Sequence, residues 1–145
     1  MTGPAKKVTP VVPATLYHFT CREHGEPGIT KDQKLLPHKQ FLLGRHLVWL
    51  TDMDTPNAWA LGLTNYLLCC DRTQVRVTVH PLTLNDKCGI HPWWYYRRTI
   101  PPVLREALEQ TGMPMHWWVT ELPVPIDTIT PTAHAWAARK ATSHA

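Results

Sequence analysis

Hydrophobic and polar residues alternate most regularly between Thr73 and Val79. Val75, Val77 and Val79 face one way and the polar residues between them face the other, which is the period-two pattern of a strand. Pro81 ends this segment, because proline has no N–H to donate to a neighbouring strand. The pattern therefore predicts a half-buried strand over 73–79.

Further segments also predict strands. Residues 15–20 (TLYHFT) are mainly β-branched and aromatic, and residues 46–51 (HLVWLT) hold an unbroken apolar run. A run without a polar face is typical of a strand that is covered on both sides. Residues 116–121 (HWWVTE) and 124–129 (VPIDTI) predict two short strands separated by Pro123.

The clearest helix is predicted over 100–111. Pro101 and Pro102 open it, and Gly112 closes it. Its apolar residues recur at helical spacing and form one stripe: Val103, Leu104, Ala107 and Leu108. This segment should pack one face on a core.

The remaining helices are expected to be short. One is predicted to begin at Pro27 and another at Pro56, and Lys34–Pro37 is expected to be an extended bridge. The chain contains 14 prolines, which argue against long helices. We therefore expect an α+β fold, with a compact, split, mostly antiparallel sheet and a few short helices.

Length and composition indicate one globular unit. A chain of 145 residues suits a single domain, and 43% hydrophobic with 18% charged residues is ordinary for one. The Pro-, Lys- and Thr-rich residues 1–14 are expected to form a disordered arm. We place the globular domain at 15–130 and a flexible tail at 131–145.

The charge pattern leaves the partner open. The net charge of +4 is scattered along the chain, which permits a polyanionic or phosphate-bearing partner without requiring one. No apolar run is long enough for a secretory signal or a membrane span. We therefore expect a cytoplasmic protein with reduced cysteines and no membrane partner.

Two polar residues stand out as candidate catalytic groups. Short motifs for nucleotide loops, serine hydrolases and zinc proteases are missing from the sequence. His18 interrupts an apolar strand, so it is either hydrogen-bonded there or functional. Glu121 ends a strand beside Trp117 and Trp118, where it is either a solvated carboxylate or a desolvated one that attracts a cation-like ligand.

An aromatic run and two Cys-x-x-His pairs leave further alternatives. Residues 93–96 (WWYY) precede Arg97 and Arg98, so they either stack on bases or an adenine or pack in the core. A zinc site would need Cys21 and His24 to meet a second pair that is 64 residues away, Cys88 and His91. Because their loops have no evident reason to meet, we expect no metal site.

Taken together, the landmarks resemble a family of small proteins from actinobacteria and their phages. The likeness covers about 110 residues and implies no activity. It rests on LYHFT (16–20), HGEPGI (24–29), LLP (35–37), VWLTD (48–52), LGLT (61–64), CDRT (70–73), MPMHWWV (113–119) and PVP (123–125).

The order of these motifs is also similar to that of the ADP-ribosyltransferases, in the subgroup with rifampin-modifying enzymes and DNA-targeting toxins. The resemblance implies that Tyr17, His18, Phe19 and Thr20 form the first NAD-binding motif. His18 would hold a ribose hydroxyl, and the Phe19 backbone would hold the nicotinamide amide. The bridge 33–35 lacks the glycine that these families carry.

The same resemblance assigns the later motifs. Trp49 and Thr51 would line the nicotinamide pocket, with Trp49 or Tyr66 replacing the tyrosine that usually packs on nicotinamide. Glu121 would stabilise the oxocarbenium ion as nicotinamide leaves. On this hypothesis the protein uses NAD as substrate and transfers ADP-ribose to an unknown acceptor, for which a protein and a nucleic acid both remain open. His18, Thr51 and Glu121 must then line one pocket.

Two alternatives remain open. One is a non-enzymatic interaction module of phage type that binds a host protein or nucleic acid through residues 93–98. The other is a small zinc-binding domain. The first differs from the transferase because it does not need His18 and Glu121 in one pocket.

Overall fold

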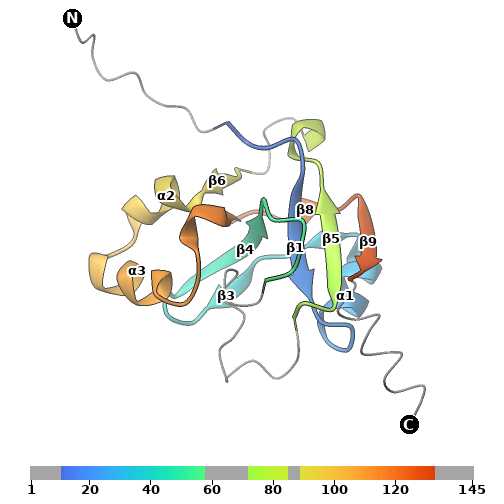
Figure 1. The fold of residues 1–145 in the computed structure, drawn as a ribbon, viewed down its shortest axis with the longest axis horizontal. Helices are drawn as coiled ribbons and strands as arrows, with labels where there is room; N and C mark the ends of the chain where they lie inside the picture. The colour runs from blue at the N-terminus through green and yellow to red at the C-terminus, as the bar shows by residue number, and fades with distance from the viewer. Residues whose placement is uncertain (1–10, 58–71, 85–88, 133–145) are drawn as a thin grey trace, which may run out of the picture.

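The computed structural model describes residues 11–57, 72–84 and 89–132. Strands and short helices follow one another along the chain (Figure 1). The strands are β1 (Leu16–Thr20), β2 (Lys34–Leu35), β3 (His38–Gln40), β4 (Arg45–Thr51), β5 (Val75–Val79), β6 (His91–Pro92), β7 (Trp117–Thr120), β8 (Val124–Pro125) and β9 (Thr128–Pro131). The α-helices are α1 (Gly25–Asp32), α2 (Trp93–Tyr96) and α3 (Pro102–Glu109), with 3₁₀ turns at Pro81–Leu84, Arg97–Thr99 and Pro114–His116.

The main sheet is antiparallel in every described pairing. Its strand order is β6-β7-β4-β1-β5-β9, and β3 adds to the beginning of β4. A separate ribbon joins β2 to β8. This arrangement confirms the predicted α+β class with a mostly antiparallel sheet and a few short helices.

The junction between β1 and β4 is narrow. These strands share one residue pair, Tyr17 with Thr51, whereas β1 pairs with β5 along its whole length. Just past the junction, the ring Nδ1–H of His18 donates to the Trp49 carbonyl at 2.8 Å. The imidazole therefore satisfies a β4 carbonyl where the ladder with β1 has ended.

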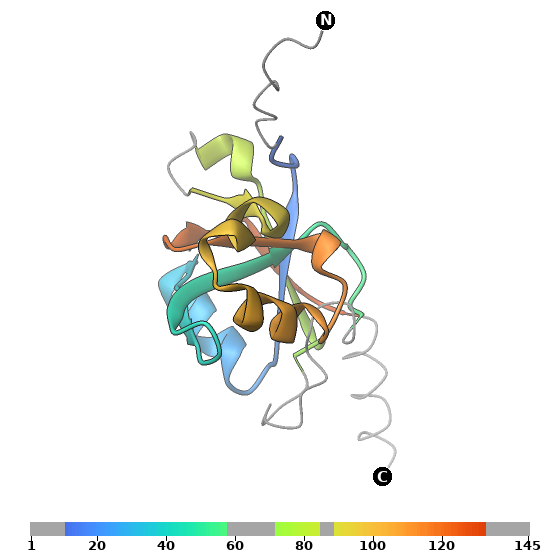
Figure 2. The same cartoon turned by 90° about the vertical axis from the view of Figure 1, so that its left-hand side faces the viewer.

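Each face of the sheet carries its own core. On one face, Leu16, Val48 and Val77 pack with Leu35 and Val124 of the small ribbon. On the other face, residues of β4 and β7 pack with α2 and the segment after it: Leu47, Trp117, Val119, Trp93, Tyr96 and Ile100. Figure 2 shows α2 and α3 in front of the sheet. The apolar β4 run is thus covered on both sides, as the sequence predicted.

The turn between β3 and β4 sets the start of β4. Gly44 has a φ of 68°, a conformation that a glycine adopts without a steric penalty. Its N–H donates to the Gln40 carbonyl at 2.8 Å, which closes the turn. This closure fixes Arg45, whose side chain reaches α2 and the turn after it.

The sheet extends past the predicted domain boundary at residue 130. Strand β9 ends at Pro131, and the Thr132 N–H donates to the Gln74 carbonyl at 3.0 Å. At the other end, Val12 of the predicted arm packs against a core. The helix predicted after Pro56 falls largely outside the described residues.

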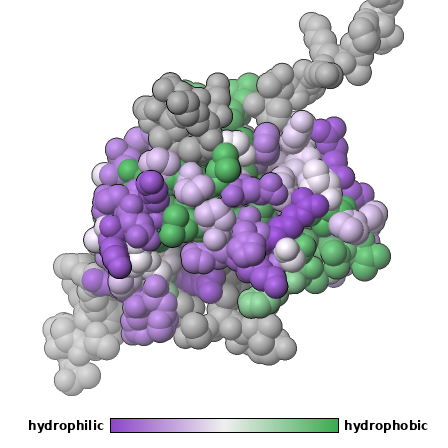
Figure 3. Space-filling model, turned by 180° about the vertical axis from the view of Figure 1, so that it is seen from behind, coloured by the Kyte–Doolittle hydropathy of each residue, from purple (hydrophilic) through white to green (hydrophobic). Residues whose placement is uncertain are grey.

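The face of the molecule that points away from the viewer in Figure 1 is hydrophilic over much of its centre. Hydrophobic residues gather on the side that carries α2 and α3 (Figure 3). The described helices include none that is long and apolar enough to cross a membrane.

Candidate functional site

His18 lies on the face of β1 that meets the first core. It is partly buried beside Val77, its partner on β5. Burial lowers the pKa of His18, the hydrogen bond to the Trp49 carbonyl opposes that effect, and the positive charge of Arg72 adds to the lowering. His18 is therefore neutral near pH 7. Its proton is on Nδ1, because the Trp49 carbonyl can only accept a hydrogen bond.

The other predicted NAD-binding residues serve the sheet and its cores. Trp49 packs against Trp93 and Trp117, with ring centroids 5.5 and 5.7 Å apart. Thr51 is buried, and its hydroxyl accepts from the Met53 N–H at 3.1 Å.

The residues of the first predicted NAD-binding motif, 17–20, also serve the fold. The guanidinium of Arg76 lies 5.1 Å from the centre of the Tyr17 ring. Phe19 and Thr20 are buried. Tyr66 lies outside the described residues.

Glu121 lies far from His18. Continuing the register of β1 on β4 by one residue places His18 beside Leu50, in one core. Continuing that of β7 on β4 places Glu121 beside Leu47, in the other core. The two residues are two strands and three positions apart, roughly 14 Å between Cα atoms, on opposite faces. The prediction that they share one pocket is wrong, because it used motif order without strand register.

A half-open pocket does lie beside Glu121. Its volume is about 390 Å³. It forms where the C-terminal end of β7 lies near α2 and the turn that follows, and it is lined by Gly89, His91, Tyr95, Tyr96, Thr99, Thr120, Glu121 and Leu122. Neither His18 nor Thr51 belongs to this lining.

The aromatic run 93–96 builds one wall of the pocket as a helix. Trp93 and Tyr96 are three residues apart and both point into the core. Trp94 and Tyr95, between them, are 51% and 36% exposed. This helix was not predicted from the sequence, because four consecutive aromatic residues show no apolar periodicity. The usable signal was Pro92, which precedes the first helical position.

A chain of hydrogen bonds runs along the pocket wall. Arg45 donates through Nη1 to the Tyr96 hydroxyl at 3.1 Å, and that hydroxyl donates to Oε1 of Glu121 at 3.2 Å. Arg45 also donates to the hydroxyl and carbonyl of Thr99, both at 2.7 Å. Burial raises the pKa of Tyr96, against the lowering effect of Arg45, so the phenol stays protonated and can donate.

The exposed aromatic residues are held by their own contacts. The ring of His91 stacks on Tyr95 with centroids 5.2 Å apart, and the Arg98 guanidinium lies 4.2 Å from the Tyr95 ring centre. Trp94 meets the edge of Tyr95 at 6.2 Å. Tyr95 is therefore fixed, and the outer surface of Trp94 remains open to solvent.

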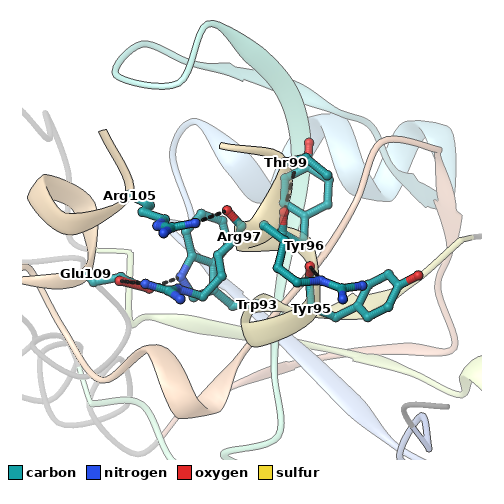
Figure 4. Close-up of polar contacts among 8 residues, drawn as sticks. Trp93, Tyr95, Tyr96, Arg97, Thr99, Arg105 and Glu109 are labelled. Carbon is teal, nitrogen blue, oxygen red and sulfur yellow. Dashed lines mark hydrogen bonds and ion pairs between the residues drawn. The ribbon is translucent and has the colours of Figure 1, made fainter. Parts of the chain in front are cut away.

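A second network ties α2 to α3. Figure 4 shows Trp93 and Arg97 pointing toward Glu109. Trp93 donates through Nε1 to the Glu109 carboxylate at 2.6 Å, and Arg97 donates twice to it, at 2.8 and 3.1 Å. Arg105 donates to the Arg97 carbonyl at 3.3 Å. Because its members bond to one another, this network stabilises the fold.

Two histidine–carboxylate pairs lie elsewhere. His116 meets Asp52 at 2.7 Å, and His80 meets Asp127 at 3.3 Å. All four side chains are about a third or more exposed, and none lines the described pocket. We therefore treat both as histidine–carboxylate contacts of the surface.

The zinc hypothesis cannot be assembled from the described residues, because Cys88 lies outside them. The buried Cys21 sulfur accepts from the His24 N–H at 3.4 Å. His91 is used in the stack on Tyr95. In the described ranges, no three His, Cys, Asp or Glu side chains group as metal ligands would.

Comparison with known proteins adds no family. No protein-family model, curated protein or solved structure matches the chain.

Proposed function

We propose that this protein is a non-enzymatic interaction module that binds a partner protein through α2. The observation that carries the proposal is the pairing of half-exposed Trp94 with a pocket on the same side of the sheet. Tryptophan, tyrosine and arginine dominate the energetics of protein interfaces, and Trp94, Tyr95 and Arg98 bring these three types together. Trp93 and Tyr96 anchor this surface in the core, so it is presented rigidly.

The charges favour a protein over a nucleic acid. The carboxylate of Glu121 lines the pocket and would repel a phosphate. Arg97 is paired with Glu109, which leaves Arg98 as the exposed arginine of the α2 segment. A nucleic-acid surface normally concentrates several unpaired basic groups on one face.

The ADP-ribosyltransferase hypothesis, for both the fold and the use of NAD, is the competing proposal. It needs His18 and Glu121 at one NAD molecule, and these residues lie on opposite faces of the sheet. Its direct test is nicotinamide release from NAD by the full-length chain. Release above the no-protein rate would support the transferase and overturn a non-enzymatic function.

The binding test uses a random linear peptide library displayed against the full-length protein. Selected peptides are then synthesised, and their affinities are measured by fluorescence anisotropy for wild type, Trp94→Ala and Phe41→Ala. Phe41 is the matched control, since it is an aromatic residue that is 89% exposed on the β3–β4 turn. We expect Trp94→Ala to weaken binding by about 30-fold, as interface hot spots do. Equal affinity for wild type and Trp94→Ala would reject the proposal.

A further inference from the structure

The carboxylate of Glu121 has unused hydrogen-bonding capacity in the pocket. The Tyr96 hydroxyl donates to Glu121, and the Thr99 hydroxyl donates to the Tyr96 carbonyl at 2.9 Å. A carboxylate has about four acceptor positions. Among the described residues, Glu121 receives one hydrogen bond, from Tyr96, and forms no ion pair. A ligand that binds Glu121 is therefore expected to supply donors.

The electrostatics of the pocket favour a cation among such donors. Glu121 is the one carboxylate in the lining. The rings of Tyr95 and Tyr96 already lie against the guanidinium groups of Arg98 and Arg45, 4.2 and 5.5 Å from the ring centres, so the attraction for a further cation comes from Glu121. Arg45 does not line the pocket, and the Tyr96 hydroxyl stands between it and Glu121. Because Coulomb energy falls with distance, a cation bonded to Glu121 is attracted more strongly than Arg45 repels it.

The size of the pocket suits a side chain. Its volume of about 390 Å³ is near the lower end of the range for small-molecule sites. The open surface of Trp94 lies beside this wall and offers contact area outside the pocket. A side chain inserted from a neighbouring chain would use both features.

We propose that the pocket receives the charged end of a lysine or arginine side chain of the partner protein, with Glu121 as its acceptor. This inference rests on the proposed interaction function, and it adds the chemistry of the residue that the partner inserts. Trp94 then packs on the partner surface next to the inserted side chain.

The first experiment uses small probes, so it does not depend on any selected peptide. N-acetyl-lysine N-methylamide is titrated into ¹⁵N-labelled full-length protein, and N-acetyl-norleucine N-methylamide serves as the uncharged control. We expect saturable shifts of the Gly89, Thr99 and Glu121 amides with the lysine probe alone. Glu121→Gln should weaken binding by about tenfold, since it removes a charge-assisted hydrogen bond. Equal shifts with both probes would overturn the inference.

The matched control variant is Glu106→Gln. Glu106 is an exposed carboxylate on α3 outside the pocket lining, so this change removes the same charge from another place. We expect its lysine affinity to match that of wild type. A loss equal to that of Glu121→Gln would mean that net charge alone drives binding, and it would overturn the site.

The second experiment separates this inference from the function on which it rests. In the selected peptides, each lysine is replaced by norleucine and each arginine by citrulline. The inference is supported if one such replacement weakens binding to the wild-type protein by about tenfold and the same replacement does not weaken binding to Glu121→Gln. Peptides that depend on Trp94 but tolerate every replacement overturn the inference and leave the interaction function standing. Peptides that do not depend on Trp94 overturn both.

Discussion

Two networks beside α2 each combine an aromatic residue, an arginine and a glutamate, in different arrangements. In the first, Trp93, Arg97 and Glu109 form a closed network, in which the carboxylate accepts three hydrogen bonds and its side chain is 19% exposed. In the second, Arg45 and Glu121 do not bond to each other, and the Tyr96 hydroxyl links them. Glu121 is exposed and borders a pocket.

The difference shows how one type of residue serves two purposes. A carboxylate whose acceptors are filled by its own chain stabilises the fold, and removing it leaves donors unsatisfied. A carboxylate with acceptors to spare adds little to stability, but it is available to a ligand. We therefore expect variants of the Glu109 network to affect folding and variants of Glu121 to affect binding.

The largest effect is expected for Glu109→Ala. Trp93 is 1% exposed, so its indole N–H would be left buried without its acceptor, at a cost of about 2 kcal/mol. Glu106→Ala is the control, since it makes the same substitution on the exposed side of α3 and should change stability by less than about 0.5 kcal/mol. Urea unfolding followed by tryptophan fluorescence gives both values. Similar losses in the two variants would contradict a stabilising role for the network.

The second effect is a dependence of stability on acid. Burial alone would raise the pKa of Glu109, but hydrogen bonds from Arg97 and Trp93 and the nearby charge of Arg105 outweigh it and lower the pKa below 4.5. The unfolded chain therefore binds this proton more tightly than the folded chain. The stability contributed by Glu109 is complete above pH 4.5 and is lost as the pH falls through the lower folded-state pKa.

Thermal melts from about pH 7 to about pH 3 check this dependence. The difference in Tm between wild type and Glu109→Gln should be constant at neutral pH and should shrink below pH 4.5. A constant difference for Glu109→Gln at all pH values would contradict the lowered pKa.

The third effect is that of Tyr96→Phe. This change removes the hydroxyl that links Arg45 to Glu121 and keeps the ring in the core, so we expect a loss of about 1 kcal/mol. Tyr95→Phe is the control, because it deletes the same atom from the neighbouring exposed tyrosine, whose hydroxyl bonds to no described residue. Its stability should be unchanged. Equal losses in urea unfolding would show that the link contributes nothing.

The periodicity of apolar residues correctly predicted two kinds of strand, one with a single polar face and one with no polar face. The alternation of Val75, Val77 and Val79 became β5, and the apolar run that ends at Thr51 became β4 between two cores. The helix α2 was missed, because its buried and exposed members are all aromatic. Which of them enters the core is decided by packing against Trp117 and Leu47.

The candidate site was only partly predicted, because its residues come from distant parts of the chain. Glu121 was selected as a strand-end carboxylate beside tryptophans, and it does border a pocket. Its partner Tyr96 comes from 25 residues earlier in the chain, and no local pattern reveals such a contact. His18 was grouped with Glu121 by motif order, whereas strand register and the alternation of side chains place it on the other face.

The smallest effect on stability is expected for Glu121→Gln. Glutamine keeps the length of the side chain and a carbonyl oxygen that can accept from the Tyr96 hydroxyl, so the hydrogen bond survives. The lost charge is exposed and makes no direct ion pair with a described residue, so stability should change by less than about 0.5 kcal/mol. Urea unfolding beside Glu109→Gln measures the contrast, because the same chemical change at Glu109 weakens two charge-assisted hydrogen bonds from Arg97. A loss at Glu121 as large as that at Glu109 would mean that both carboxylates are structural, and the difference between the two networks beside α2 would disappear.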